Sequence, residues 1–163
     1  MSAPTEIRPL QRLLIGHGAL LIFFGGVLGF LFLFFLIGKI ALWPIPGDIK
    51  FQMPGTYDDW RMAHMEGITN GFLLWLAAAL LPLFPFALKG LKRVAWSVII
   101  IGWSIVLASA IKPFFVDSRG LEFGGPVSNN VVFFLFYIGV PGVMILMAVI
   151  AWRCFRPAEA GRG

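Results

Sequence analysis

The sequence of 163 residues is poor in charge and in the residues that usually bind metals. Only 13% of the residues are charged, and there are one cysteine and two histidines. The single Cys154 excludes an intrachain disulfide and a metal cluster built from cysteines. His17 and His64 fall short of the three or four protein ligands that a zinc site takes. The chain also lacks a GxSxG motif and a Walker loop, so no common hydrolase or nucleotide-binding signature is present.

Apolar residues dominate instead, at 59% of the chain, with 17 phenylalanines and six tryptophans. The mean hydropathy is +0.88, whereas soluble domains are usually about half apolar and a quarter charged. A membrane-spanning helix needs about 20 apolar residues. Four runs meet this need, at approximately 13–38, 62–88, 94–112 and 130–152. We predict an all-α integral membrane protein, one domain over residues 1–163 that forms a bundle of four transmembrane helices.

The segments between these runs are polar. The first, WPIPGDIKFQMPGTYDDW, holds three prolines, which indicate a loop. With four spans both termini share one side, and that side holds eight Lys and Arg residues against five on the other. The positive-inside rule therefore predicts cytoplasmic termini. The net charge of +5 is explained by basic cytoplasmic loops that contact lipid headgroups. Nucleic-acid binding is not expected, because no Lys/Arg-rich recognition element is present.

The stretch WRMAHMEGITNG, residues 60–71, carries the candidate metal ligand. Haem takes only one or two axial ligands from the protein, so a metal bound by His64 favours haem. In a helix that begins near Trp60, His64 shares one face with Gly67 and Gly71, at i, i+3 and i+7. These glycines serve either close helix packing or a flat groove for a porphyrin ring. Asn70 points about 120° away from His64 and would face a cavity shared with another helix or subunit.

The second histidine is not expected to share an iron with the first. His17 lies about one turn into the first helix from the cytoplasmic side, and His64 lies at the outer start of the second helix. Two ligands of one iron must lie within about 4 Å of each other. We expect His17 to pack or to form a hydrogen bond. As an ionisable residue inside a membrane, it is also a functional candidate.

Five short stretches resemble one known family in their order and spacing. They are GHG in the first helix, IKFQMPG in the first loop, WRMAHMEGITNG, GW at positions 102 and 103, and SRGLEFG before the fourth helix. Over nearly the whole chain they resemble styrene oxide isomerases, small membrane enzymes of bacterial styrene degradation. The resemblance implies a homotrimer in the bacterial inner membrane, with ferric haem b near the subunit contacts. It also implies His64 as the axial ligand and Asn70 as a residue that positions the epoxide.

The resemblance gives one further candidate site position, and residue type and place in the chain give three more. The family's third helix carries a tyrosine thought to hold the substrate oxygen, and counting from GW places Ser109 at that position. A serine hydroxyl reaches less far. Tyr137 in the fourth helix either aims its phenol into the cavity or is an interfacial or packed aromatic. Arg61 and Arg119, on the His64 side of the membrane, either pair with haem propionates or anchor at lipid headgroups.

The implied activity is the isomerisation of a lipophilic aryl epoxide, such as styrene oxide, to an aldehyde, phenylacetaldehyde. Ferric haem would act as a Lewis acid, the benzylic C–O bond would break, and a 1,2-hydride shift would follow. An apolar cavity would exclude the water that traps the cation as a diol. Two other classes stay open. A haem protein for electron transfer or sensing would be favoured by a second axial ligand from the protein, and a scaffold without cofactor would show no Soret band.

Overall fold

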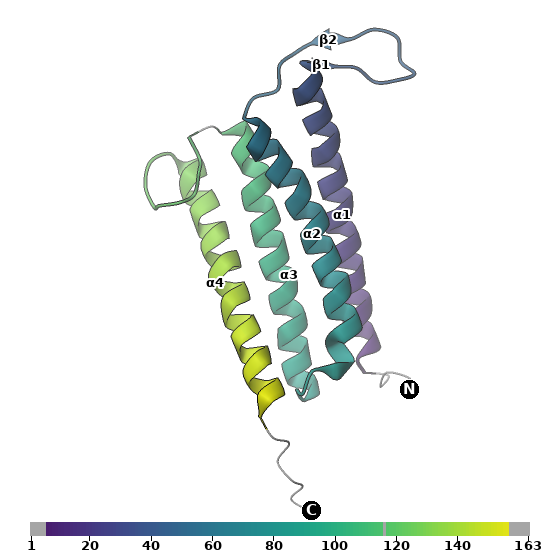
Figure 1. Cartoon of the computed structure of the whole chain (residues 1–163), viewed down its shortest axis with the longest axis vertical. Helices are drawn as coiled ribbons and strands as arrows, with labels where there is room; N and C mark the ends of the chain where they lie inside the picture. The colour runs from purple at the N-terminus through teal and green to yellow at the C-terminus, as the bar shows by residue number, and fades with distance from the viewer. Residues whose placement is uncertain (1–5, 116, 157–163) are drawn as a thin grey trace, which may run out of the picture.

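A computed structural model describes residues 6–115 and 117–156 as four long helices (Figure 1). The helices are α1 (Arg8–Ile37), α2 (Tyr57–Leu80), α3 (Leu88–Ile111) and α4 (Val127–Phe155). All four segments are long and apolar enough to cross a membrane, with mean hydropathies from 1.4 for the α2 segment to 2.9 for α1. The predicted all-α fold of four long apolar helices is confirmed, and these helices mark a multi-pass membrane protein.

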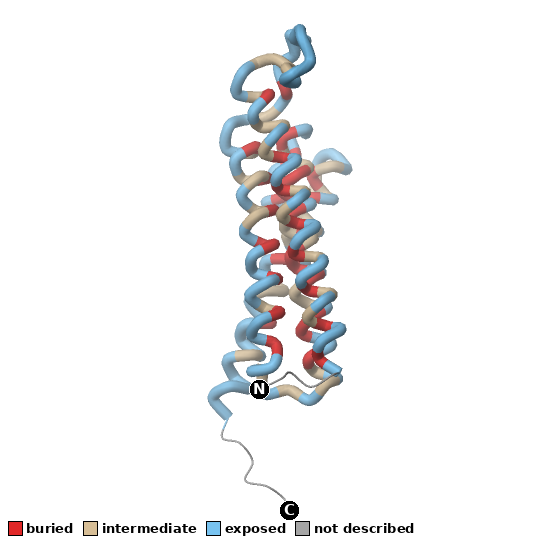
Figure 2. Tube along the Cα trace, turned by 90° about the vertical axis from the view of Figure 1, so that its right-hand side faces the viewer, coloured by how far each residue is buried: buried red, intermediate tan, exposed pale blue. Residues whose placement is uncertain are grey.

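The helices lie side by side in chain order (Figure 1). In addition α1 contacts α3, while α4 packs chiefly on α3 and forms one edge of the molecule. Of the most apolar window in each helix, 56% is buried in α3, against 22% in α1 and 11% in α4. Figure 2 shows the buried residues along the contacts between helices and exposed residues on the outward faces. The apolar outer faces of α1 and α4 therefore meet lipid or another subunit.

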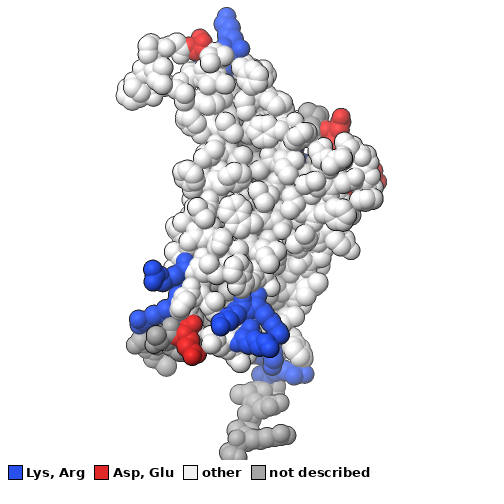
Figure 3. Space-filling model, turned by 180° about the vertical axis from the view of Figure 1, so that it is seen from behind, with Lys and Arg blue, Asp and Glu red and all other residues white. Residues whose placement is uncertain are grey.

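The two ends of the molecule differ. At the terminal end, α1 begins, α4 ends, and the short turn η1 (Leu81–Leu83) leads from α2 towards α3. The opposite, loop end carries β1 (Lys39–Ile40) and β2 (Ile49–Lys50), which pair antiparallel, and the short turn η2 (Lys112–Phe114). Figure 3 shows the charged side chains of one face gathered at the two ends, with uncharged surface between them. A bilayer requires such an uncharged band.

The ends of α2 are set by a capping residue and by prolines, and they differ from the ends of the apolar run in the sequence. α2 begins at Tyr57, because Thr56 caps the helix by accepting a hydrogen bond from the backbone N–H of Asp59 at 3.3 Å. The first loop therefore ends at Thr56, earlier than the sequence predicts. α2 ends at Leu80 instead of near residue 88, because Pro82 and Pro85 cannot continue its hydrogen-bond ladder.

Glycines set the closest helix contact, which lies between α1 and α2. A Cβ atom on Gly67 would lie 2.5 Å from the Cα of Gly25, and one on Gly71 would lie 2.7 Å from the carbonyl oxygen of Gly18. Small residues four positions apart allow two backbones to touch in this way. Of the two alternatives for Gly67 and Gly71, the structure has close helix packing. The α1 backbone fills the space beside both glycines, and their part in a haem site stays a prediction.

Candidate active site

His64 lies between α1 and α2, and α1 fixes its ring. Its Nδ1 atom is 2.9 Å from the carbonyl oxygen of Gly25. Because a carbonyl oxygen only accepts, Nδ1 carries the proton and donates, which leaves a lone pair on Nε2. Gly29 makes room for the ring, since a Cβ there would lie 2.5 Å from Nδ1. Metal-binding histidines are usually oriented by such a hydrogen bond from the other ring nitrogen.

The remaining nitrogen of His64 is free to bind a ligand. Nε2 has no hydrogen-bond partner in the described part of the chain, and the ring is partly exposed. Within residues 6–115 and 117–156, no three His, Cys, Asp or Glu residues lie together to hold a metal ion. Haem needs only one protein ligand. A lone, oriented histidine at membrane depth therefore fits haem.

Asn70 is buried on the α2 surface that faces α3. Its Cβ lies 3.8 Å from the position that a Cβ on Gly102 would take. Its Nδ2 donates to the backbone carbonyl of Glu66 at 3.0 Å and to the Glu66 carboxylate Oε2 at 2.8 Å. A carbonyl oxygen only accepts, so the amide atom beside it must be the nitrogen. Both Nδ2 hydrogens are thus engaged, and Oδ1 is the atom of this amide that stays available to a ligand.

Glu66 is a site residue that the motifs of the sequence do not mark, although two signals point to it. An ionisable side chain inside a membrane helix is costly and is generally kept for function. Residues four apart on a helix are neighbours, which places Glu66 beside Asn70. The hydrogen bond between them orients the Asn70 amide and gives the Glu66 carboxylate a donor within the apolar helix.

Ser109 and Tyr137 are placed very differently. Ser109 on α3 is 0% exposed, and its Oγ is the one fully buried side-chain polar atom without a hydrogen-bond partner in the described part of the chain. An unpaired buried hydroxyl costs about 1–3 kcal/mol. Tyr137 is 64% exposed on α4 and stacks on Phe133, with ring centroids 5.7 Å apart. In the single chain its ring is an outward-facing aromatic, which is the second of the two alternatives for it.

His17 forms a hydrogen bond, as expected. Trp103 Nε1 donates to His17 Nδ1 at 3.1 Å, and the two rings meet edge to face. The GHG and GW stretches of the sequence therefore meet in space. His17 precedes Gly25 by eight residues, which is about 12 Å of helix. Since Gly25 is the partner of His64, the two histidines lie too far apart to bind one iron within a chain.

The two arginines lie at the loop end. Arg61 is exposed and lies 3.7 Å from Asp58. Arg119 is exposed and lines a hollow of about 270 Å³ together with Thr56 and Lys112. Among the described residues, no hydrogen bond or ion pair joins either arginine to His64. Pairing of these arginines with haem propionates stays a prediction.

The candidate groups lie in two neighbouring helix contacts. His64 faces α1, and Asn70 faces α3. Ser109 follows Gly102 by seven residues and so lies on the same face of α3 as the glycine that Asn70 meets. Asn70 and Ser109 thus lie on the α2–α3 side at two levels about 10 Å apart along α3, while His64 lies in the α1–α2 contact. One chain supplies a metal-competent imidazole, an oriented amide and an unpaired hydroxyl.

These features define a class: small four-span membrane proteins with one oriented histidine and a part-buried amide–carboxylate pair. The family model for styrene oxide isomerase matches residues 10–155. A styrene-oxide isomerase of Pseudomonas fluorescens is 32% identical over 119 residues, which are 72% of this chain and 69% of the relative. The chain belongs to the styrene oxide isomerase family and is an isomerase, and the resemblance drawn from its short stretches is confirmed.

Proposed function

We propose that this isomerase converts an aryl epoxide such as styrene oxide to its aldehyde, with haem b held by His64. The observation that carries the proposal is the 2.9 Å contact of His64 Nδ1 with the Gly25 carbonyl, which leaves Nε2 to bind iron. Ferric haem supplies a Lewis acid for the epoxide oxygen. Because the reaction is an isomerisation, it needs no electron donor and no second substrate.

The protein's own groups serve the two atoms where charge develops. As the benzylic C–O bond breaks, negative charge builds on oxygen and positive charge on carbon. The Ser109 hydroxyl, buried without a partner, is a donor for the oxygen. The Oδ1 of Asn70 is the negative end of an oriented amide dipole, and it suits the positive charge that spreads from this carbon into the aryl ring. Glu66 holds that amide through Nδ2, so it is a positioning residue. Oriented dipoles of this kind are effective because they need no reorganisation during reaction.

The surroundings favour rearrangement over hydrolysis. A cluster around Leu28, Ala63 and Trp60 includes Phe24, Phe32 and Phe35 and extends from the level of His64 towards the loop end. An apolar wall excludes the water that would add to the cation and give a diol. A hydride can then move from the neighbouring carbon, which yields the aldehyde. A lipophilic epoxide also reaches such a site directly from the bilayer.

We further propose a homotrimer in the bacterial inner membrane with cytoplasmic termini. Only 22% and 11% of the most apolar windows of α1 and α4 are buried within the chain, so both helices have apolar area left for subunit contacts. Tyr137 on the outer face of α4 and Arg119 at the loop end would reach a His64 site from a neighbouring subunit. The Lys and Arg residues of the terminal end support its cytoplasmic location.

The test is a direct assay. Purified, haem-loaded protein in detergent is incubated with styrene oxide, and the products are separated by gas chromatography. We expect phenylacetaldehyde as the main product, with little diol. If haem-loaded protein converts no aryl epoxide of any size, the proposed substrate class is wrong. A second axial ligand in its spectrum would then favour a haem protein for electron transfer or sensing.

A further inference from the structure

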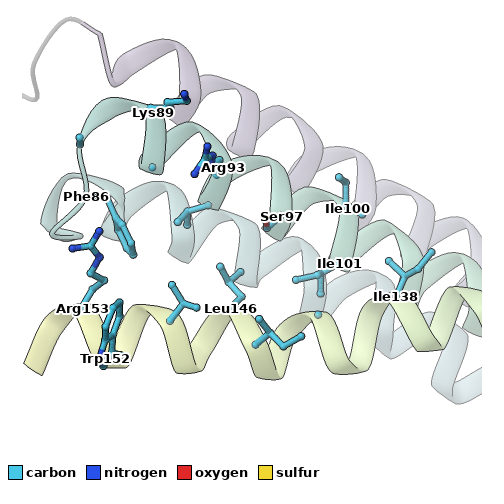
Figure 4. Close-up of a pocket in the computed structure, with 16 residues that line it drawn as sticks. Phe86, Lys89, Arg93, Ser97, Ile100, Ile101, Ile138, Leu146, Trp152 and Arg153 are labelled. Atoms are coloured by element: carbon cyan, nitrogen blue, oxygen red, sulfur yellow. The ribbon is translucent and has the colours of Figure 1, made fainter.

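A second hollow lies away from the candidate active site, between α3 and α4 at the terminal end (Figure 4). Its volume is about 700 Å³. The deeper wall is made of aliphatic side chains from both helices, namely Ile100, Ile101, Ile138, Ile145, Leu146 and Val149. No carboxylate lines it. We call it the α3–α4 groove.

Cations gather at one end of the α3–α4 groove. Figure 4 shows Lys89 and Arg93 on α3 and Arg153 on α4 at the end nearest the helix termini. The Arg153 guanidinium lies 5.6 Å from the ring centroids of both Phe86 and Trp152, which hold it at the mouth. Every ion pair in the described part of the chain lies at the loop end. These three cations therefore have no carboxylate partner there and are available to an outside anion.

The dimensions of the groove match one leaflet of a bilayer. From Lys89 to Ile101 is about 18 Å of helix, and half of the hydrocarbon core is about 15 Å. The deep end is closed where α4 approaches α3: a Cβ on Gly139 would lie 2.5 Å from Ile105, and one on Gly142 would lie 3.1 Å from Ile101. Ser97, one turn deeper than Arg93, is the only hydroxyl side chain on the wall.

We propose that the α3–α4 groove binds one anionic phospholipid. Its phosphate lies among Lys89, Arg93 and Arg153, its ester region lies near Ser97, and one acyl chain follows the aliphatic wall. A free anion would use the cations but leave this wall unoccupied, and a neutral lipid would fill the wall but leave the cations unpaired. An anionic lipid satisfies both. This site is independent of the proposed reaction.

The experiment is native mass spectrometry of the haem-loaded protein in detergent, with phosphatidylglycerol or phosphatidylcholine of identical acyl chains. We expect one phosphatidylglycerol to be retained and phosphatidylcholine to be lost. Each cation near an anionic lipid surface contributes about fivefold in affinity. The double variant Arg93→Gln/Arg153→Gln should therefore bind phosphatidylglycerol on the order of 30-fold more weakly. Val149→Trp, which fills the aliphatic wall, should also release it.

The matched control is Arg12→Gln/Lys92→Gln, which removes two exposed cations of the terminal end, one on α1 and one on α3, that do not line the groove. It should retain phosphatidylglycerol. Equal loss in both double variants would mean diffuse attraction to the terminal end and would overturn the site. Full retention in Val149→Trp would overturn it too, because the chain would then lie elsewhere. Displacement by millimolar inorganic phosphate would assign the cations to a free anion and contradict a lipid.

Discussion

The α1–α2 contact and the α3–α4 contact both rely on glycine, but they use it in different ways. In the first, glycines on both helices bring backbone against backbone, so that a Cβ on Gly67 would lie 2.5 Å from the Gly25 Cα. In the second, the glycines that meet the opposite helix are Gly139 and Gly142, both on α4. There a Cβ on Gly139 would meet the side chain of Ile105 at 2.5 Å.

This difference explains where the chemistry lies. A backbone contact positions a carbonyl precisely, and the Gly25 carbonyl fixes the His64 ring. Contacts through flexible isoleucine side chains position nothing polar, and they leave the α3–α4 groove beside them. The tight contact therefore suits a metal ligand, whereas the looser one suits lipid.

The largest expected effect comes from breaking the tight contact. A Cβ on Gly25 would lie 2.9 Å from the backbone nitrogen of Ile68, whereas one on Gly26 would have nothing within 4 Å. Gly25→Ala should separate the helices, release haem and lower the thermal midpoint, because backbone atoms cannot move aside as side chains do. Gly26→Ala is the neighbouring control and should behave as wild type. Fluorescence-detected thermal melts and haem content measure both, and equal behaviour of the two variants would refute the packing account.

The next effect concerns the oriented amide in the α2–α3 contact. Asn70→Ala should lower kcat by about 10²–10³, the cost of losing one preorganised dipole, while haem content stays the same. Steady-state kinetics with styrene oxide and an absorption spectrum of the same sample separate the two quantities. Loss of haem together with activity would show that Asn70 serves the cofactor site and not the substrate.

A smaller effect is expected at Glu66, which acts through Asn70. Glu66→Ala removes the 2.8 Å carboxylate contact but keeps the backbone one, so kcat should fall by about tenfold, or about 1.4 kcal/mol. Glu66→Gln keeps an acceptor oxygen and should restore most of the activity. KM should change little in either variant. If Glu66→Ala still lowers kcat tenfold in a protein that already carries Asn70→Ala, Glu66 does not act by positioning Asn70.

The smallest effect is expected at Ser109, where one substitution should raise the stability and lower the turnover. Ser109→Ala removes a buried hydroxyl without a partner, so the protein should become more stable, by on the order of 1 kcal/mol. It should nevertheless become slower, because the epoxide oxygen loses a donor. Thermal melts and turnover on one preparation test both signs. A more stable variant with full activity would show that this hydroxyl does not meet the substrate.

How far the sequence predicts this structure depends on how local each feature is. The four spans and the shared face of His64 and Gly67 follow from composition and helical period, which are properties of single helices. The hydrogen bond between Glu66 and Asn70 could also have been predicted, since it joins residues four apart on one helix. The partner of His64 could not be predicted, because Gly25 lies on another helix and its place depends on the rotation and register of two helices. The α3–α4 groove could not be predicted for the same reason.

The central claim is that the α1–α2 contact presents His64 as the ligand of haem. The most direct measurement is the absorption spectrum of purified wild-type, His64→Ala and His17→Ala proteins expressed with excess haem. We expect a Soret band in the wild type and in His17→Ala, because Trp103 holds His17 away from the haem site. We expect no Soret band in folded His64→Ala. A full Soret band in His64→Ala, or its loss only in His17→Ala, would contradict the account.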